Sequence, residues 1–350
     1  METNICNWNQ NQTAIRALQE GQVIAFPTET VYGLGAISSD KDAFDRLCRV
    51  KGRPENKPFT LMVGNYGDIA RFAHVDSRII ALIHEYMPGQ VTFLLKARAG
   101  IPYHLDLGTG VIGVRFPGLP SLCDLIEAVG EPLLVPSANK SGLAPCTSKE
   151  EILQVFGGEI ACLIGDDAPQ GEPSTIVDLS HEGEIKLVRQ GAIPFEKLQK
   201  SFENAGKQAI SLGSDHGGYQ LKEAAKAHLQ AIGYAVIDEG CDSTASCDYP
   251  IYAKAAAKDV VEGKASLGFL FCTTGEGVAI AANKIDGIRC GIGYNDIVTA
   301  KNREHNHANM IAFGQKHMNQ EDVLRRIDIF LTQMPSDLAK HVRRVDQLEK

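Results

Sequence analysis

Two clusters of polar residues near the amino end of the chain combine types that could do chemistry. The segment FPTETVYGLG at 26–35 places two hydroxyls, a carboxylate and a phenol within six residues, directly after the apolar run 22–26. Pro27 cannot donate a ladder hydrogen bond, so we expect a strand to end there. Gly33 and Gly35 would allow a tight turn or a close approach to a ligand. The segment is therefore either a binding loop or a turn whose polar groups satisfy one another.

The second cluster, KGRPENKP at 51–58, carries three cations within seven residues. Two prolines and a glycine interrupt it, so we do not expect a regular helix there. A loop held in this way could act as a fixed clamp for an anion. The alternative is a solvated basic loop without a ligand.

Two further polar segments follow apolar stretches in the first half of the chain. SANKSG at 137–142 comes after the apolar run 132–135, and STIVD at 174–178 begins a strand-like run with two hydroxyls. Each could be only a polar turn. GTGVIG at 108–113 leads into a strand-like run rather than a helix, so it favours a hairpin turn over a dinucleotide fingerprint.

The chain has no G-x-x-x-x-G-K-[ST] motif, so ATP binding by a P-loop is not supported. An enzyme that handles ATP without this loop must neutralise the triphosphate with side chains and magnesium. The cationic candidates are Lys51, Arg53, Lys57, Arg115 and Arg189.

In their order along the chain, PTETVYGLG, KGRPENKP, SANKSG and STIVD resemble the motifs of the YrdC-type threonylcarbamoyl-AMP synthases. The resemblance implies that L-threonine, bicarbonate and ATP, with Mg²⁺, form threonylcarbamoyl-AMP and pyrophosphate. It also implies that the product feeds the tRNA-modification machinery. Such a step needs charge neutralisation and close positioning more than a protein nucleophile. The resemblance assigns threonine and nucleotide binding to Thr28, Thr30, Tyr32, Lys51, Arg53, Lys57, Arg115, Ser137, Asn139, Thr175 and Arg189.

The apolar runs of the first half predict a mixed α/β domain. Strand-like runs outnumber helical stretches and many connections are short, which favours a twisted, partly antiparallel sheet with helices. The expected strands lie near 22–26, 59–63, 91–95, 111–116, 132–135, 161–164, 174–179 and 185–188, and the expected helices near 12–20, 40–50, 76–86, 119–129 and 149–156. We expect a first domain over 1–200, a linker over 201–207 and a second domain over 208–350.

The second domain shows a strict alternation of strands and helices. Strand-like runs at 210–213, 234–238, 267–272, 288–293 and 309–313 are each separated by a helical stretch. This pattern predicts a doubly wound parallel sheet of the Rossmann-like class. Ligands of such sheets bind at the carboxyl ends of the strands.

Four motifs of this half, SDHGGYQLK, DYP, IAANK and REHNHAN, resemble those of the type B ribose-5-phosphate isomerases and related sugar-phosphate isomerases over 208–346. The resemblance implies interconversion of ribose 5-phosphate and ribulose 5-phosphate without a cofactor, in a homodimer with shared sites. It assigns the base to Cys272, oxyanion contacts to Thr274, Gly275 and Gly277, ring opening to His305, sugar contacts to Asp215, His216 and Asn306, and the phosphate to Lys340 and Arg344. A helix N-terminus after Cys272 would favour its thiolate.

Three departures from the family pattern leave alternatives open. The loop reads CTTGEG at 272–277 where the family has CGTGxG, so Thr273 replaces a glycine and could restrict φ. Glu276 puts a carboxylate near the thiol, either as a perturbing charge or as a base. Lys340 stands where arginine is common and lacks its bidentate geometry. The second half could thus act on another aldose–ketose phosphate, or serve as a non-catalytic dimerisation or binding module.

Composition limits the remaining classes. The 350 residues carry a net charge of −8, with 18 Lys and Arg against 25 Asp and Glu in residues 1–205. This balance argues against RNA binding as the main role, although a local basic patch remains possible. Nine scattered cysteines without a C-x-x-C pair fit a reducing cytoplasm better than a disulfide framework or a metal site. No long apolar run or secretory signal occurs, so we expect a cytoplasmic protein without a membrane partner.

Overall fold

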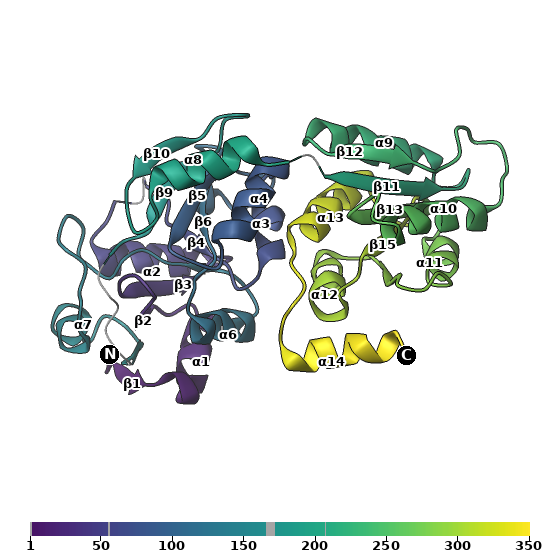
Figure 1. Ribbon diagram of the computed structural model, residues 1–350. Helices are drawn as coiled ribbons and strands as arrows, with labels where there is room; N and C mark the ends of the chain where they lie inside the picture. The colour runs from purple at the N-terminus through teal and green to yellow at the C-terminus, as the bar shows by residue number, and fades with distance from the viewer. Residues whose placement is uncertain (1, 55–56, 166–171, 207) are drawn as a thin grey trace. The chain divides into compact units, whose positions relative to one another are not determined.

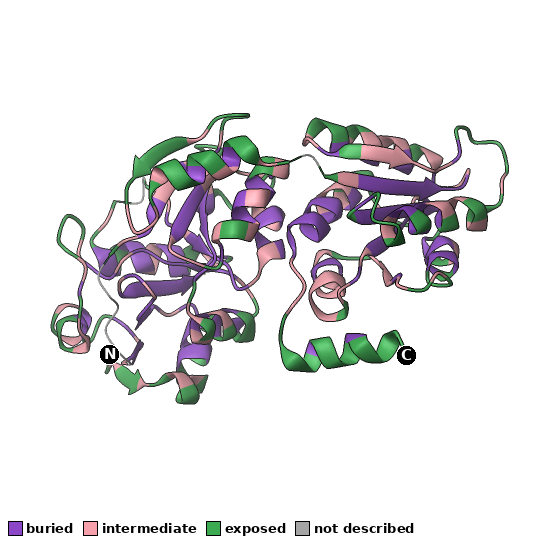
Figure 2. Ribbon diagram, in the orientation of Figure 1, coloured by how far each residue is buried: buried purple, intermediate pink, exposed green. Residues whose placement is uncertain are grey.

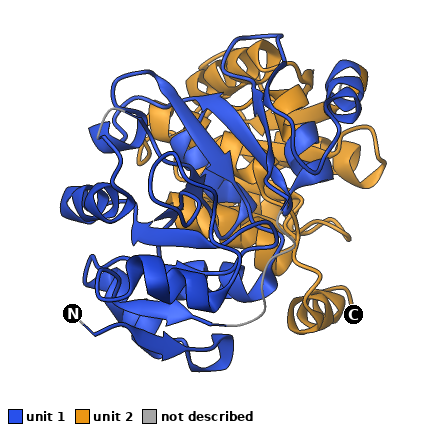
Figure 3. Cartoon of the chain, turned by 90° about the vertical axis from the view of Figure 1, so that its left-hand side faces the viewer, with its two compact units in different colours: residues 1–74, 81–203 blue, residues 75–80, 204–350 orange. Residues whose placement is uncertain are grey.

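The computed structural model describes residues 2–54, 57–165, 172–206 and 208–350 and divides the chain into two compact units (Figures 1 and 3). The amino-terminal unit comprises Met1–His74 with Ala81–Glu203, and the carboxy-terminal unit comprises Val75–Ile80 with Asn204–Lys350. The division falls inside the segment 201–207 that we expect to be a linker, and helix α8 (Phe195–Asn204) occupies the first part of that segment. In the described ranges, no helix has both the length and the apolar character needed to span a bilayer.

The amino-terminal unit is built on a ten-stranded sheet in the order β1-β8-β2-β3-β7-β4-β6-β5-β9-β10. The pairs β1–β8, β2–β8, β4–β6 and β5–β9 are parallel and the other neighbours are antiparallel, which confirms the predicted mixed sheet. The strands are β1 (Asn4–Cys6), β2 (Ile24–Phe26), β3 (Gly33–Ile37), β4 (Leu61–Met62), β5 (Val91–Lys96), β6 (Val111–Arg115), β7 (Leu133–Leu134), β8 (Cys162–Ile164), β9 (Thr175–Asp178) and β10 (Lys186–Arg189).

Helices complete this unit and cover its apolar strands, whose central residues are buried (Figure 2). Helix α1 shows the reason at the sequence level, because Ala14, Ile15 and Leu18 recur on one face and all three are buried. The helices are η1 (Trp8–Gln10), α1 (Gln12–Gln19), α2 (Lys41–Lys51), α3 (Tyr66–Phe72), α4 (Ser77–Tyr86), α5 (Tyr103–Asp106), α6 (Pro120–Val129), α7 (Lys149–Phe156) and α8; the first residues of α4 cluster with the other unit.

One local difference from the sequence expectation concerns Gly33 and Gly35, which do not turn the chain but lie in strand β3, antiparallel to β2. A Cβ atom at Gly35 would stand 2.4 Å from the ring of Phe26, and one at Gly33 would stand 2.7 Å from Val135. These glycines therefore permit close packing between strands rather than a special backbone angle.

The carboxy-terminal unit has a five-stranded sheet in the order β12-β11-β13-β15-β14, and every pairing is parallel. This confirms the predicted Rossmann-like sheet. Strands β11, β13 and β15 are almost fully buried (Figure 2), as expected when helices cover both faces. The elements are β11 (Ala209–Ser214), α9 (Tyr219–Ala231), β12 (Ala235–Asp238), α10 (Tyr249–Val261), β13 (Leu267–Cys272), α11 (Glu276–Ala282), β14 (Cys290–Ile292), α12 (Asp296–Asn306), β15 (Met310–Gly314), α13 (Gln320–Thr332) and α14 (Ala339–Leu348).

The register of this sheet defines its two edges. Ser214 is paired with Phe271 and Cys272 with Gly314, so the segments after β11, β13 and β15 share the carboxyl edge. Helix α12 starts after β14 at that edge and runs back, so that its last residues precede Met310 at the amino edge. Predicted site residues that follow a strand therefore lie at the carboxyl edge, and those at the end of α12 lie at the amino edge.

Candidate functional sites

The amino-terminal unit contains a cavity of about 350 Å³ bordered by residues from seven separate segments of the sequence. Four cationic side chains line this cavity, which we call the cationic cavity, and no carboxylate lines it within the described residues. Its polar lining comprises Thr30, Lys51, Arg53, Thr60, Thr92, Arg115, Ser137, Ser174 and Arg189. An anion that carries several charges is the ligand that such a lining attracts best.

Helix α2 brings Lys51 to the cavity. The helix begins at the N-cap Asp40, whose side chain accepts from the Asp42 N–H, and ends at Gly52, a C-cap with φ +62°. Lys51 is the last helical residue, and its carbonyl accepts from the Ser141 N–H at 2.9 Å. This backbone hydrogen bond thus links the KGRP and SANKSG motifs.

The ammonium of Lys51 is buried among neutral oxygens. It donates to the carbonyls of Ser137 (2.6 Å) and Asn139 (3.2 Å) and to Oδ1 of Asn139 (3.0 Å). Burial, more than the neighbouring Arg53 cation, lowers the pKa of Lys51 to about 8. An anion beside this ammonium would stabilise its charged form and so offset both effects.

Arg53 and Arg189 extend the positive lining. Arg53 donates to the Pro58 carbonyl (3.3 Å) and lies over the Phe59 ring with 5.0 Å between its Cζ atom and the ring centroid. Arg189 donates to the carbonyl of Ser174 at 2.8 Å. Burial lowers the pKa of both guanidinium groups, and Arg115 contributes further to the lowering at Arg189. Like charges are thus held close together, which costs free energy unless an anion is bound.

Arg115, at the end of β6, differs from the other three cations because it has a carboxylate partner. Its Nη2 donates to Oε1 of Glu29 (2.7 Å) and to the Thr30 hydroxyl (3.0 Å). Sequence reasoning noted the carboxylate of Glu29 but gave it no role. The signal available in the sequence was one acidic residue inside a segment otherwise rich in hydroxyls, which a cation-rich cluster follows further along the chain.

The structure brings most of the predicted residues of this unit together. Thr30, Lys51, Arg53, Arg115, Ser137 and Arg189 line the cationic cavity. Thr28, Tyr32, Asn139 and Thr175 are buried but do not line it. Lys57 is exposed and is not among the lining residues. Residues 55–56, in the middle of the KGRPENKP motif, lie outside the described part of the chain.

The buried hydroxyls and amide act on neighbouring groups. Asn139 Oδ1 accepts from Lys51 and from the Ser137 hydroxyl (2.6 Å), so it orients two lining residues. The Thr175 hydroxyl donates to the Ile193 carbonyl (2.6 Å) and accepts from two N–H groups, those of Gly191 and Ile193. Its hydrogen bonds hold the chain after β10, which leaves little capacity for a ligand.

In the carboxy-terminal unit, one group of predicted residues lies at the carboxyl edge of the sheet. Cys272 ends β13, is buried, and its Sγ accepts from the Gly275 N–H at 3.0 Å. Asp215 follows the adjacent strand β11, and its Oδ1 accepts from the N–H groups of Gly217 (3.0 Å) and Gly218 (3.1 Å). His216 accepts from the Cys247 N–H at Nδ1. These residues form one contiguous cluster beside the start of α11.

The departures in the CTTGEG loop cause no backbone strain there. The left-handed angle of this loop belongs to Gly275, with φ +88°, and Thr273 does not adopt a positive φ. The Thr274 hydroxyl accepts from the Glu276 N–H at 3.3 Å, a local hydrogen bond just before α11, whose N-cap is Gly275. Glu276 is exposed, and Gly277 packs against the Tyr249 ring, which a Cβ atom would approach to 3.0 Å.

The second group lies at the amino edge, at the end of α12. The rings of His305 and His341 stack with centroids 4.2 Å apart, so α14 is held against α12. Burial lowers the pKa of both imidazoles below the ordinary histidine value. Asn306, Lys340 and Arg344 are exposed. Because the sheet is parallel, these residues are separated from Cys272 by the length of a strand.

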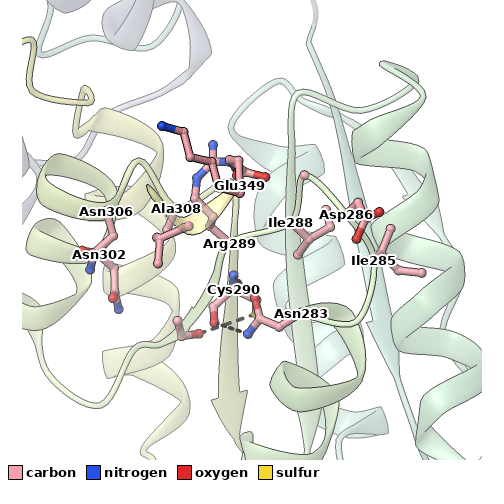
Figure 4. Close-up of a pocket in the computed structure, with 14 residues that line it drawn as sticks. Asn283, Ile285, Asp286, Ile288, Arg289, Cys290, Asn302, Asn306, Ala308 and Glu349 are labelled. Carbon is pink, nitrogen blue, oxygen red and sulfur yellow. Dashed lines mark hydrogen bonds and ion pairs between the residues drawn. The ribbon is translucent and has the colours of Figure 1, made fainter. Parts of the chain in front are cut away.

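A cavity of about 650 Å³ opens at this amino edge (Figure 4). It is lined by the loop before β14, the end of α12 and the last residues of the chain, including Asn306. Figure 4 shows Asn283 bound to the backbone of Cys290, with 2.8 Å in each of the two hydrogen bonds. None of Cys272, Thr274, Glu276, Asp215, His216 and His305 lines this cavity. Within one copy of the unit, the residues at the carboxyl edge and those at the amino edge thus do not share this cavity.

No group of three or more His, Cys, Asp or Glu side chains in the described residues could hold a metal ion. Magnesium that accompanies a nucleotide binds largely to phosphate oxygens, and the cations of the cavity would hold the same phosphates. The lining therefore fits a magnesium–nucleotide complex through contacts with its phosphate groups.

The two units thus define a class: an α/β domain with a cavity lined by cations, followed by a parallel-sheet domain of the Rossmann-like class. Residues 16–191, half of the chain, match the model of the Sua5/YciO/YrdC family, described as "Telomere recombination". The chain belongs to this family. Residues 210–348 match the LacAB/RpiB model, described as "Ribose/Galactose Isomerase", so the second unit is an RpiB-like domain.

Relatives of the first unit include both a named synthase and an uncharacterized protein. The chain is 34% identical over 185 residues to the threonylcarbamoyl-AMP synthase of Pyrococcus abyssi, over 52% of this chain and 54% of that protein. It is 32% identical over 180 residues to the uncharacterized protein YciO of Escherichia coli, over 51% of this chain and 87% of YciO. The E. coli YciO crystal structure matches with a TM-score of 0.51 and 27% identity, over 56% of this chain and 98% of that chain. The chain thus spans about half the length of the P. abyssi relative.

A solved structure similar to the second unit is ribose-5-phosphate isomerase B of Clostridium thermocellum. It is 37% identical and covers 40% of this chain and 95% of its own, with a TM-score of 0.39.

Proposed function

We propose that the amino-terminal unit forms threonylcarbamoyl-AMP from L-threonine, bicarbonate and ATP. The observation that carries the proposal is the cationic cavity, in which four positive side chains and the hydroxyls of Thr30 and Ser137 share one space. Lys51, Arg53 and Arg189 donate to neutral oxygens, so their positive charge is available to a ligand. The similarity to a named synthase supports the same choice.

In this reaction the threonine amine and bicarbonate form a carbamate, whose oxygen attacks the α-phosphorus while pyrophosphate leaves. Negative charge gathers on the leaving phosphates, and fixed cations in a water-poor cavity stabilise such charge strongly. Lys51 and Arg53 suit this task because both have defined contacts: Lys51 ends α2 and donates to Ser137 and Asn139, and Arg53 donates to the Pro58 carbonyl. Arg115 and Thr30, which are bound to each other, suit the amino acid. The product then enters tRNA modification.

Mass detection of threonylcarbamoyl-AMP tests the proposal. The full chain is incubated with L-threonine, bicarbonate, ATP and Mg²⁺, and we expect product that depends on each substrate. Removing a positioned donor that stabilises developing charge costs about 10²-fold or more in rate, so Lys51→Ala and Arg53→Ala should abolish measurable product. Lys96→Ala, which removes an exposed cation at the end of β5, is the matched control. A chain that makes no product with all substrates present would refute the proposal.

For the carboxy-terminal unit we propose a sugar-phosphate isomerase whose sites each combine two copies of the chain. The motivating observation is the separation of the two predicted groups: Cys272 with Asp215 lies at the carboxyl edge, and His305 with Asn306 lies at the amino edge. In a symmetric dimer the carboxyl edge of one copy can face the amino edge of its partner, which would create two equivalent sites. Ribose 5-phosphate is the substrate that the family match favours.

Cys272 would then remove the proton between the two sugar carbons, with the N–H groups of the CTTGEG loop facing the oxyanion. A neutral His305 would open the sugar ring, and Lys340 and Arg344 would hold the phosphate. Turnover of ribose 5-phosphate by the full chain, measured as formation of ribulose 5-phosphate, tests this proposal. If the protein is dimeric but Cys272→Ala leaves turnover unchanged, the base is misassigned. If wild-type protein shows no turnover of any pentose phosphate, the proposal fails, and the alternatives are another aldose–ketose phosphate or a non-catalytic dimerisation or binding module.

A further inference from the structure

Glu29 is the one acidic side chain that the described structure places in contact with the cations of the cavity. Its Oε1 accepts from Arg115 Nη2 at 2.7 Å and from the backbone N–H of Gly118 at 2.9 Å. Its carbonyl accepts from the Gln90 side chain at 3.1 Å. The carboxylate thus has a second donor in the backbone N–H of Gly118, and the Gln90 side chain holds the backbone of Glu29, so the position of the carboxylate does not depend on Arg115 alone.

The pair is mostly withdrawn from water, with 8% of the Arg115 side chain and 18% of the Glu29 side chain exposed. Arg115 also donates to the Thr30 hydroxyl, which lies 2.9 Å from the Thr28 hydroxyl. The Thr28 hydroxyl in turn donates to the Val31 carbonyl at 2.7 Å. A chain of hydrogen bonds thus connects Glu29 through the Arg115 guanidinium to the two threonine hydroxyls of its own PTET segment.

This network distinguishes two kinds of cation around the same cavity. Lys51, Arg53 and Arg189 donate to neutral oxygens and keep their full charge for a ligand. The charge of Arg115 is balanced by Glu29, so its main property is a fixed direction. A triphosphate attracts every nearby cation, and an unbalanced Arg115 would be drawn toward the phosphates and away from its fixed place.

We propose that Glu29 is a positioning residue that holds Arg115 in place and limits the positive charge of the cationic cavity. Its removal should have two opposite effects. Affinity for a polyvalent anion should rise, because the cavity gains net positive charge. Turnover should fall, because Arg115 loses the direction that aligns the reactants. The turnover part rests on the proposed function, and the affinity part does not.

The test uses Glu29→Gln in the full chain, because glutamine keeps an acceptor oxygen and removes only the charge. Inorganic pyrophosphate is the binding probe, measured by calorimetry, and product formation gives kcat and KM. We expect pyrophosphate affinity to rise about threefold to tenfold from the added charge. We expect kcat to fall about tenfold or more, without a rise in the KM for ATP, from lost positioning. Glu131→Gln is the matched control, because that carboxylate accepts from Ser39 outside the cavity.

Two further variants separate positioning from a structural role. Glu29→Asp keeps the charge but shortens the side chain, so it should show wild-type pyrophosphate affinity and only part of the wild-type kcat. If Glu29→Gln does not fold, Glu29→Asp alone tests whether Glu29 positions Arg115. With Arg115→Lys already present, Glu29→Gln should lower kcat little further, since the two residues act as a unit. Reduced pyrophosphate affinity in Glu29→Gln, or both parameters within twofold of wild type, would overturn the inference. If the wild-type chain forms no product, the proposed function fails, and the pyrophosphate series alone decides the role of Glu29.

Discussion

The two units place their predicted site residues in opposite ways. In the amino-terminal unit, segments far apart in the sequence converge on one cavity, and six predicted residues line it. In the carboxy-terminal unit, residues close to the strand ends are carried to two different edges of one sheet. A mixed sheet can bring loops from several directions to one place, whereas a parallel sheet with crossover helices assigns each loop to an edge. On the proposed assignments, the first unit would suffice for its chemistry, and the second would need residues from another copy.

Mixing two inactive isomerase variants tests whether each site of the carboxy-terminal unit combines residues from two copies. Cys272→Ala and His305→Ala should each lose about 10²–10⁴-fold in ribose 5-phosphate turnover, the usual contribution of an acid or base. When equal amounts are unfolded and refolded together, random pairing should restore about one quarter of the wild-type activity, because half of the dimers carry one intact site of two. Steady-state kinetics on the mixture gives the result. Absence of recovery in a mixture shown to exchange subunits would place both residues in one chain's site.

The pH dependence of anion binding tests the cationic cavity of the amino-terminal unit. The pKa of Lys51 is lowered to about 8, so its positive charge is present below that pH and lost above it. Affinity for ATP should therefore be steady near pH 7 and then weaken, toward about tenfold per pH unit well above pH 8. Calorimetric titrations at several pH values measure this. Lys51→Arg, which stays charged, should remove the decline; a wild-type affinity that does not change up to pH 9.5 would contradict the lowered pKa.

A smaller effect separates supporting residues from lining residues in the first unit. Thr175→Val removes a hydroxyl that serves three backbone groups, so it should cost about 1–3 kcal/mol in the free energy of unfolding. Urea denaturation measures the loss, with Thr175→Ser as the control that keeps the hydroxyl. We expect ATP affinity to change much less than stability. A variant with wild-type stability and poor binding would make Thr175 a ligand contact after all.

The smallest expected effect concerns Lys57. This residue belongs to the same basic motif as Lys51, but its side chain is exposed and lies outside the cavity lining. Exposed charges contribute little, so Lys57→Ala should change product formation by less than about twofold. The measurement is kcat/KM for ATP at physiological ionic strength. A loss comparable to that of Lys51→Ala would show that the motif closes on its ligand.

Much of the fold could be predicted from the order of apolar and polar segments. The strict alternation after residue 208 predicted the parallel sheet, because crossover helices leave few other arrangements. Strand β3 was missed, since Gly33 and Gly35 are typical of turns and the packing against Phe26 that requires them is not visible in the sequence. Strand β1 and helix α3 were missed too, because a three-residue edge strand and a two-turn helix carry little periodicity.

The sequence by itself determined the chemistry that is available: which motifs occur, that cations and hydroxyls are concentrated in them, and that two units follow each other. Residue types and local spacing are sufficient for that. Only the tertiary structure decided which of these groups share a space. Lys51 and Lys57 are six residues apart in one motif, yet one is buried among oxygens and the other is exposed. Glu29 acquires its partners Arg115 and Gly118 only when β6 is placed beside the PTET segment, because contacts between residues distant in sequence depend on how the strands pair.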